Sequence, residues 1–339
     1  MKKVLVTGGT GFVGLQIIFQ LLAQGYDVRT TIRKDSGKSR ILKVLADNNV
    51  QNLANLSFIK ADLSSDDNWL EAMADRDGVF SVASPVFFGK IQNEFDAIKP
   101  ALNGTIRILK AADRAGVKRV VMTSNFGAVG FSKKTGLTTE ADWTDENQAG
   151  LSIYEKSKLL AEKAAWNFVK QPDVDVELVT VNPVAIFGPS LDKHVSGSFD
   201  LLKNLMSDQM KLIPNLPLNV VDVRDVAAIQ IKAMEKPAAS GQRFIASADG
   251  QISMREIADL IRQKRPQAAH KISNKKLPDW LIELAAPFNQ MAREGKLMKD
   301  MNRNVSNQKA KDILNWHPRS DNEKTVLTAV DSLIKYHEV

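Results

Sequence analysis

The first half of the chain alternates short apolar runs with longer stretches whose apolar residues recur at helical spacing. The short runs predict strands, and the longer stretches predict amphipathic helices. The predicted strands are residues 4–6, 27–32, 56–59, 78–83, 119–123 and 177–181, and the main predicted helices are 15–24, 99–115 and 152–169. Such alternation is typical of a parallel sheet with helices on both faces, so we predict an α/β fold of the doubly wound Rossmann type.

The pattern changes after Pro183, where prolines interrupt short helices and strand signals become sparse. We therefore expect residues 1–183 to form the Rossmann domain, with residues 219–246 returning to its sheet. Residues 184–218 and 247–339 are expected to form a smaller, mostly helical substrate-binding region.

A glycine-rich turn joins the first predicted strand to the first predicted helix. Gly8 permits a tight turn, Gly11 leaves room for a cofactor pyrophosphate, and Gly14 lets the helix pack closely on the strand. Free N–H groups at the helix start would face the anion. The alternative is a turn without a chemical role, but its place between a strand and a helix favours dinucleotide binding. The candidate cofactor-binding residues here are Thr7, Gly8, Thr10, Gly11, Phe12, Val13 and Gly14.

The end of the second predicted strand indicates which nicotinamide cofactor is used. An acid at this place holds the ribose hydroxyls of NAD, but this chain has Arg33 followed by Lys34. A guanidinium can bind the 2′-phosphate of NADP bidentately and stack on adenine. Asp35 comes too late to reverse this preference. We predict NADP(H), with an ordinary solvated basic loop as the alternative.

Two further strand ends are expected to border the cofactor. Asp62 follows the third predicted strand, where it can accept a hydrogen bond from the adenine amino group or cap the next helix. The neighbouring Leu63 belongs to the same candidate site. After the fourth predicted strand, the small side chains of Val82, Ala83 and Ser84 allow the backbone to approach the cofactor.

Tyr154 and Lys158 stand one helical turn apart, which places a phenol and an ammonium group on one helix face. Free tyrosine titrates near roughly 10, too high for easy proton transfer at neutral pH. A neighbouring cation favours the phenolate, so we expect Lys158 to lower the pKa of Tyr154. Tyr154 would then protonate a carbonyl oxygen as a hydride reaches the carbonyl carbon.

With these motifs, most of the chain resembles the extended short-chain dehydrogenase/reductases. The branch that it is most similar to contains dihydroflavonol reductases and yeast-type methylglyoxal and aldehyde reductases. Besides the glycine turn and the Tyr154–Lys158 motif, the matching segments are residues 82–85, 103–105, 121–124, 181–183, 187–189, 221–227 and 314–319.

This resemblance implies roles for several residues. Lys158 would bind the nicotinamide ribose and tune Tyr154, and Thr123 would border the cofactor. Pro183 and Val184 would line the nicotinamide, and Ser198 would reach a cofactor phosphate.

The chain departs from the family pattern where a Thr-Ser-Ser sequence is usual and the second serine is catalytic. It has Thr123-Ser124-Asn125 instead, which puts Asn125 in the catalytic position. An asparagine amide can donate a hydrogen bond to a carbonyl oxygen, whereas Ser124 would need a backbone shift to do so. We favour Asn125 and keep Ser124 as the alternative. Ser81 and Val129 are further departures, and the second argues against the nucleotide-sugar epimerases, which commonly carry tyrosine there.

Composition narrows the remaining possibilities. The chain has no cysteine, and its four histidines lack metal-ligand spacing, so we predict no metal site. The net charge of +7 comes without the basic clusters that nucleic-acid binding needs, and no apolar run would span a bilayer. We therefore expect a cytoplasmic protein, monomeric or homodimeric, with a small carbonyl substrate. An apolar substrate pocket could come from Phe87, Phe88, Phe126, Phe131 and Phe187, for which core packing is the alternative.

These observations favour an NADPH-dependent reductase of aldehydes or ketones. One alternative is a nucleotide-sugar epimerase or dehydratase on the same fold. The other is a catalytically silent NADP-sensing protein. The missing serine supports this alternative, and the retained Tyr154 and Lys158 argue against it.

Overall fold

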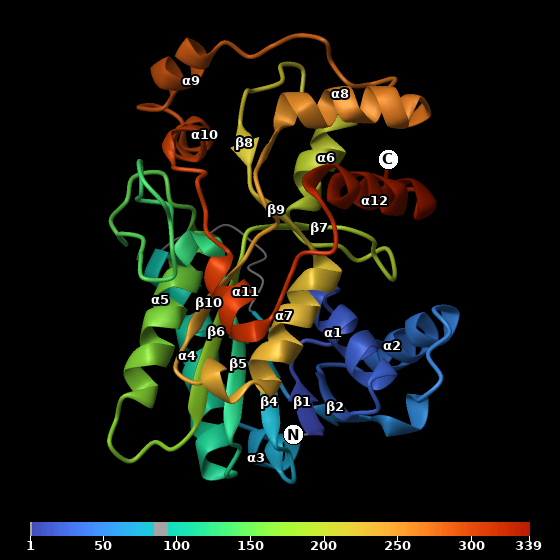
Figure 1. The fold of residues 1–339 in the computed structure, drawn as a ribbon, viewed down its shortest axis with the longest axis vertical. Helices are drawn as coiled ribbons and strands as arrows, with labels where there is room; N and C mark the ends of the chain where they lie inside the picture. The colour runs from blue at the N-terminus through green and yellow to red at the C-terminus, as the bar shows by residue number, and fades with distance from the viewer. Residues whose placement is uncertain (1, 85–93) are drawn as a thin grey trace.

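The computed structural model describes residues 2–84 and 94–339, and its centre is a seven-stranded sheet in the order β10-β6-β5-β4-β1-β2-β3 (Figure 1). Every neighbouring pair in this sheet is parallel. Its strands are β1 (Lys3–Val6), β2 (Asp27–Ile32), β3 (Leu56–Lys60), β4 (Gly78–Ser81), β5 (Arg119–Thr123), β6 (Glu177–Pro183) and β10 (Arg243–Ala246). The order reverses between β1 and β4, where doubly wound sheets bind their ligands.

Helices cover both faces of this sheet, as the strand–helix alternation predicts. Along β1, Val4 and Val6 point into one core and Leu5 into the other, and all three are fully buried. The first core takes up α1 (Phe12–Ala23), α2 (Asp35–Asp47), α7 (Val223–Glu235) and α11 (Gln308–Leu314). The second takes up α3 (Trp69–Met73), α4 (Glu94–Arg114) and α5 (Ile153–Val169). The predicted Rossmann-type fold is confirmed.

The C-terminal region lies over the carboxyl ends of the strands, opposite the end of the sheet at which the chain begins (Figure 1). It has its own apolar core, in which α6 (Phe199–Leu205), α8 (Met254–Lys264) and α12 (Asn322–Lys335) pack together. Its other helices are α9 (Asp279–Ala285) and α10 (Gln290–Asp300), and its strands β8 (Pro217–Leu218) and β11 (Ile252–Ser253) form a small sheet. The carboxyl ends of the strands are therefore covered by mostly helical structure. Among the described helices, none combines the length and apolarity that a membrane span requires.

Residues 219–246 return to the main sheet in part, because α7 packs on its face and one of their two strands joins it. Only β10 joins that sheet, at its edge beside β6. The strand β9 (Val220–Asp222) instead pairs with β7 (Ala185–Phe187) in a separate two-stranded sheet. Its buried side chains look like those of a main-sheet strand, so apolar pattern alone does not distinguish the two partners. The helix expected over 99–115 also starts earlier, at Glu94, because α4 accommodates Pro100 within its length.

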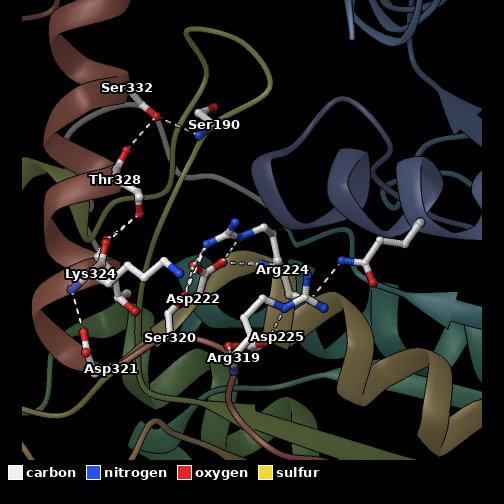
Figure 2. Close-up of polar contacts among 12 residues, drawn as sticks. Ser190, Asp222, Arg224, Asp225, Arg319, Ser320, Asp321, Lys324, Thr328 and Ser332 are labelled. Atoms are coloured by element: carbon white, nitrogen blue, oxygen red, sulfur yellow. Dashed lines mark hydrogen bonds and ion pairs between the residues drawn. The ribbon is translucent and has the colours of Figure 1, made fainter. Parts of the chain in front are cut away.

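Two buried carboxylates join α7 to the C-terminal region (Figure 2). Asp222 is fully buried and accepts hydrogen bonds from Arg224 Nε at 2.9 Å and from Ser320 Oγ at 3.2 Å. Asp225 accepts bonds from the backbone and the guanidinium of Arg319, at 3.0 and 2.8 Å. Charged groups removed from water need such partners, so this cluster fixes the junction at which the two regions meet.

Candidate active site

The turn after β1 is built so that its backbone faces the edge of the sheet. Thr7 is fully buried, and its hydroxyl accepts hydrogen bonds from the backbone of Val82 and Ala83 at 3.0 Å, which ties β1 to the end of β4. Gly8 has a φ of +70°, and a Cβ atom there would lie 2.9 Å from Ala83 Cα. A Cβ atom at Gly14 would clash with the Gly8 carbonyl oxygen. Glycine is therefore required at position 8 by conformation and by space, and at position 14 by space.

The start of α1 fits a phosphate group. Gly11 occupies the N-cap without a side-chain hydrogen bond, and the first turn holds no acid. Orphan N–H groups and the positive end of the helix dipole are thus left for an anion. A dinucleotide pyrophosphate suits this cradle, which supports the candidate roles of Thr10, Gly11, Phe12 and Val13.

An aromatic cluster brings Ser198 close to the same helix start. Phe12 and Phe199 meet edge to face with ring centroids 5.3 Å apart, and Phe187 packs on Phe199 at 5.6 Å. Ser198 directly precedes Phe199, so it lies near the glycine turn although the two are far apart in sequence. Phe187 is fully buried in this cluster, which makes it a core residue rather than part of an open substrate pocket.

The basic residues after β2 have different surroundings. Arg33 and Lys34 are exposed, and neither forms an ion pair within the described part of the chain. Arg40 instead forms an ion pair with Asp192 at 2.5 Å and donates to the Thr10 carbonyl oxygen at 3.0 Å. Asp35 is paired with Lys60 at 2.8 Å. Arg33 and Lys34 therefore remain available to an anionic ligand.

Asp62 does not cap the next helix, because that helix begins after Asn68. Its Oδ1 accepts bonds from the backbone N–H and the hydroxyl of Ser64, at 2.8 and 2.6 Å. These hydrogen bonds, with a contribution from the Arg33 charge, hold the pKa of Asp62 below its usual value. The carboxylate is fixed in its ionised form beside Arg33, and Leu63 lies next to it, half-buried.

The start of α5 positions the Tyr154–Lys158 pair. Ser152 and Glu155 form a capping box, in which each side chain bonds the backbone N–H of the other, so the first helical turn is firmly defined. Tyr154 lies in that turn with its side chain 50% exposed. Lys158, one turn further, is buried, and its Nζ donates to the Thr123 carbonyl oxygen at the end of β5 at 3.2 Å.

The ionisation of this pair differs from the expectation. Desolvation, reinforced by the neighbouring Glu155 carboxylate, raises the pKa of Tyr154 to about 12. Burial lowers the pKa of Lys158 to about 8, although the Glu162 carboxylate opposes this. The predicted lowering of the Tyr154 pKa is wrong for the protein alone, because desolvation and the neighbouring Glu155 carboxylate both disfavour the phenolate. Tyr154 is a neutral phenol at physiological pH, the form that donates a proton.

The structure separates Ser124 from Asn125. The Ser124 side chain is 2% exposed, and its hydroxyl donates to Glu162 Oε2 at 2.5 Å, so it points away from the open edge. Gly127 lies close to both Asn125 and the first turn of α5, because a Cβ atom at Gly127 would lie 3.0 Å from Asn125 Oδ1 and 2.8 Å from Glu155 Cγ. The buried Asn125 Oδ1 has no hydrogen-bond partner in the described residues. The Asn125 side chain is therefore uncommitted in the described residues, and Gly127 lies close both to it and to the helical turn that carries Tyr154.

The other residues predicted for the cofactor and substrate sites lie at a strand end or in the apolar core. Pro183 ends β6, and Val184 donates its N–H to the Ala246 carbonyl oxygen at 3.1 Å. Phe126 is buried and packs edge to face on the half-buried Phe131 at 6.3 Å, so it too belongs to the core. Phe87 and Phe88 lie outside the described residues.

No motif of the sequence indicates the polar cluster of Glu162, Asn182 and Arg243, in which both other residues donate hydrogen bonds to Glu162, one helical turn after Lys158. The available signal was an acid one helical turn after Lys158, on a face that the helix buries. That signal is weak, because the partners of Glu162 come from strands that only the fold brings together.

A phosphate cradle at the switch point of a parallel sheet, with a tyrosine and a buried lysine at the same edge, defines a nicotinamide-dependent oxidoreductase of the Rossmann class. The model of the NAD dependent epimerase/dehydratase family matches residues 4–246, and the chain belongs to this family. It is of the extended short-chain dehydrogenase/reductase type, as the sequence motifs indicate.

Named relatives are reductases. The chain is 34% identical over 283 residues to an anthocyanidin reductase of Vitis vinifera, covering 78% of this chain and 82% of the relative. It is 32% identical over 323 residues to the ketoreductase azaE of Aspergillus niger, covering 89% and 94%. The structure of the yeast methylglyoxal/isovaleraldehyde reductase Gre2 complexed with NADPH superposes with a TM-score of 0.80 at 26% identity and covers 99% of each chain.

Proposed function

We propose that this protein is an NADPH-dependent reductase of aldehydes or ketones in which Tyr154 donates the proton. The observation that carries the proposal is the neutral, half-exposed Tyr154 phenol, together with an Asn125 side chain whose buried Oδ1 has no hydrogen-bond partner in the described residues. Proton transfer and polarisation of an oxygen are the two functions that carbonyl reduction requires of protein side chains. The reductase relatives and the NADPH complex of Gre2 support this assignment.

The cofactor residues divide into three groups in this proposal. The glycine turn and Ser198 would hold the pyrophosphate, and Arg33 with Lys34 would hold the 2′-phosphate. Asp62, Leu63, Val82, Ala83 and Ser84 would border the adenosine half, and Thr123, Pro183 and Val184 the nicotinamide half. Bound NADPH supplies a hydride to the carbonyl carbon.

The protein side chains act on the carbonyl oxygen. The Asn125 amide N–H would hold this oxygen and polarise the C=O bond, and the Tyr154 hydroxyl would protonate it as negative charge develops. Lys158, held by the Thr123 carbonyl oxygen, would place its ammonium charge behind Tyr154 and stabilise the phenolate that remains. Ser124 takes no direct part, because its hydroxyl is committed to Glu162.

We expect purified protein to oxidise NADPH with at least one simple carbonyl compound in a panel of aldehydes, diketones, aryl ketones and nucleotide sugars. Loss of NADPH absorbance is the measurement, with NADH as the matched cofactor. Interconversion of a nucleotide sugar without net NADPH consumption would instead identify an epimerase. Tight NADPH binding without turnover of any compound would favour an NADP sensor.

Replacing Arg33 with alanine should weaken NADPH binding by roughly 10- to 100-fold, because a charged hydrogen bond to phosphate contributes about 1.5–3 kcal/mol. NADH binding should change little, since NADH has no 2′-phosphate. Fluorescence titration of both cofactors measures this difference. Lys43→Ala is the control, because it removes an exposed charge of α2 that is paired with Asp47. Equal losses for NADPH and NADH in the Arg33 variant would refute the assignment.

A further inference from the structure

We infer that Glu162 is a positioning residue of the active site, which holds the end of β5 in place and gives Lys158 its counter-charge. This inference rests on the proposed function, because it takes Tyr154, Lys158 and Asn125 as the reductase site. Glu162 touches neither substrate nor cofactor in that site, and it acts through its neighbours.

Glu162 is fully buried and accepts hydrogen bonds from two strands of the sheet, β6 and β10, and from the residue that directly follows β5. Its donors are Ser124 Oγ at 2.5 Å, Thr180 Oγ1 at 3.0 Å, Asn182 Nδ2 at 2.7 Å, Arg243 Nε at 2.8 Å and, from its own helix, Trp166 Nε1 at 3.3 Å. A carboxylate without water around it is stable only when its oxygens are satisfied in this way. The carboxylate thereby links β5, β6 and β10 to α5.

Two of these contacts reach the catalytic edge. The bond from Ser124 turns that hydroxyl away from the carbonyl site, which leaves Asn125 as the residue that faces it. Asn182 Nδ2 donates to Glu162 and also to the Asn125 carbonyl oxygen, at 3.1 Å. The backbone of Asn125 is therefore fixed from behind by a donor that Glu162 orients.

The charge of Glu162 acts on Lys158, which lies one turn earlier on the same helix. The carboxylate favours the ammonium form of Lys158 against the effect of burial. Arg243 moderates this charge, because its Nε pairs with Glu162 while its NH1 donates to the Glu140 and Asp142 carbonyl oxygens. Its guanidinium also lies over the Trp143 ring at 3.7 Å, so the pair is held in one geometry.

The test compares the alkaline limb of the pH–kcat profile between wild type and variants. In this limb kcat falls as Lys158 loses its proton. Glu162→Gln keeps the side-chain volume and removes the charge, so it should move this limb to lower pH by about one unit. Glu162→Asp keeps the charge and should leave the limb within a few tenths of a unit of wild type. Arg243→Gln removes the moderating cation and should move the limb upward, in the opposite direction.

Asp222→Asn is the matched control, because it neutralises an equally buried, arginine-bound carboxylate away from Lys158. It should lower the melting temperature as Glu162→Gln does and leave the limb in place. An unmoved limb in Glu162→Gln, or an equal shift in Asp222→Asn, would overturn the inference. If Glu162→Gln does not fold, the Arg243→Gln variant alone tests the inference. An alkaline limb that stays in place or moves to lower pH in this variant would then overturn the inference.

The same variants separate this inference from the proposed function. If wild-type protein reduces no carbonyl compound, the proposed function fails, and the pH dependence of NADPH binding reports the ionisation of Lys158 instead. A shift of that dependence to lower pH in Glu162→Gln then still supports the positioning role, and an unchanged dependence rejects it.

Discussion

Tyr154→Phe is expected to lower kcat for carbonyl reduction by roughly 10²- to 10⁴-fold, which is the usual contribution of a positioned proton donor. The variant removes only the hydroxyl, from a half-exposed side chain that makes no side-chain hydrogen bond in the described structure. NADPH affinity and melting temperature should therefore remain close to wild type. Single-turnover kinetics at saturating NADPH measure the chemical step directly.

The same experiment has a clear contrary outcome. If Tyr154→Phe keeps more than about a tenth of the wild-type rate, the proton comes from another group, and the assignment of Tyr154 is wrong. A proportional loss of NADPH binding would instead show that the phenol holds the cofactor.

Asn125→Ala should lower kcat by roughly 10²- to 10³-fold, because it removes the donor that polarises the carbonyl bond. Ser124→Ala should stay within roughly tenfold of wild type in kcat, since the Ser124 hydroxyl is bonded to Glu162. Its main effect should be on stability, at about 1–3 kcal/mol, because Glu162 loses a donor that no water can replace. Steady-state kinetics and thermal unfolding of both variants measure these effects.

Asn125→Ser supplies the matched control. It restores the hydroxyl that the family pattern has at this position, and it should recover activity well above that of Asn125→Ala. A kcat for Ser124→Ala below that of Asn125→Ala would reverse the assignment of the oxygen-holding role.

Local pattern predicts most of the main sheet and the cofactor turn. The bounds of β2 and β5 agree with the predicted strands. Gly14 is required by a contact within the same strand–turn–helix unit, and Gly8 by its positive φ in the turn, so their roles can be inferred from sequence, whereas the close approach of Ala83 to Gly8 depends on the fold. The pairing of β9 with β7 depends on how distant segments fold back, and the pattern of residues 220–222 does not contain that information.

For the chemistry of the site, too, some features follow from local sequence and others depend on tertiary contacts. The spacing of Tyr154 and Lys158 places them on one helix face, which the sequence alone establishes. The direction in which the pKa of Tyr154 moves depends on how much protein surrounds the phenol, and this is known only from the folded structure. Likewise, Ser124 and Asn125 are adjacent in sequence, and only the position of Glu162 shows which of them is committed.

The junction at Asp222 and Asp225 limits how this protein can change in evolution. The carboxylates stand at the start of α7, on the sheet side, while Arg319 and Ser320 belong to the segment that leads into α12. A C-terminal region taken from a relative without these partners would leave the buried Asp225 without its cation and Asp222 without its Ser320 donor, at a cost of several kcal/mol. New substrate preferences are therefore expected to arise through side chains and loops of the existing region, and an exchange of the whole region would have to include α7.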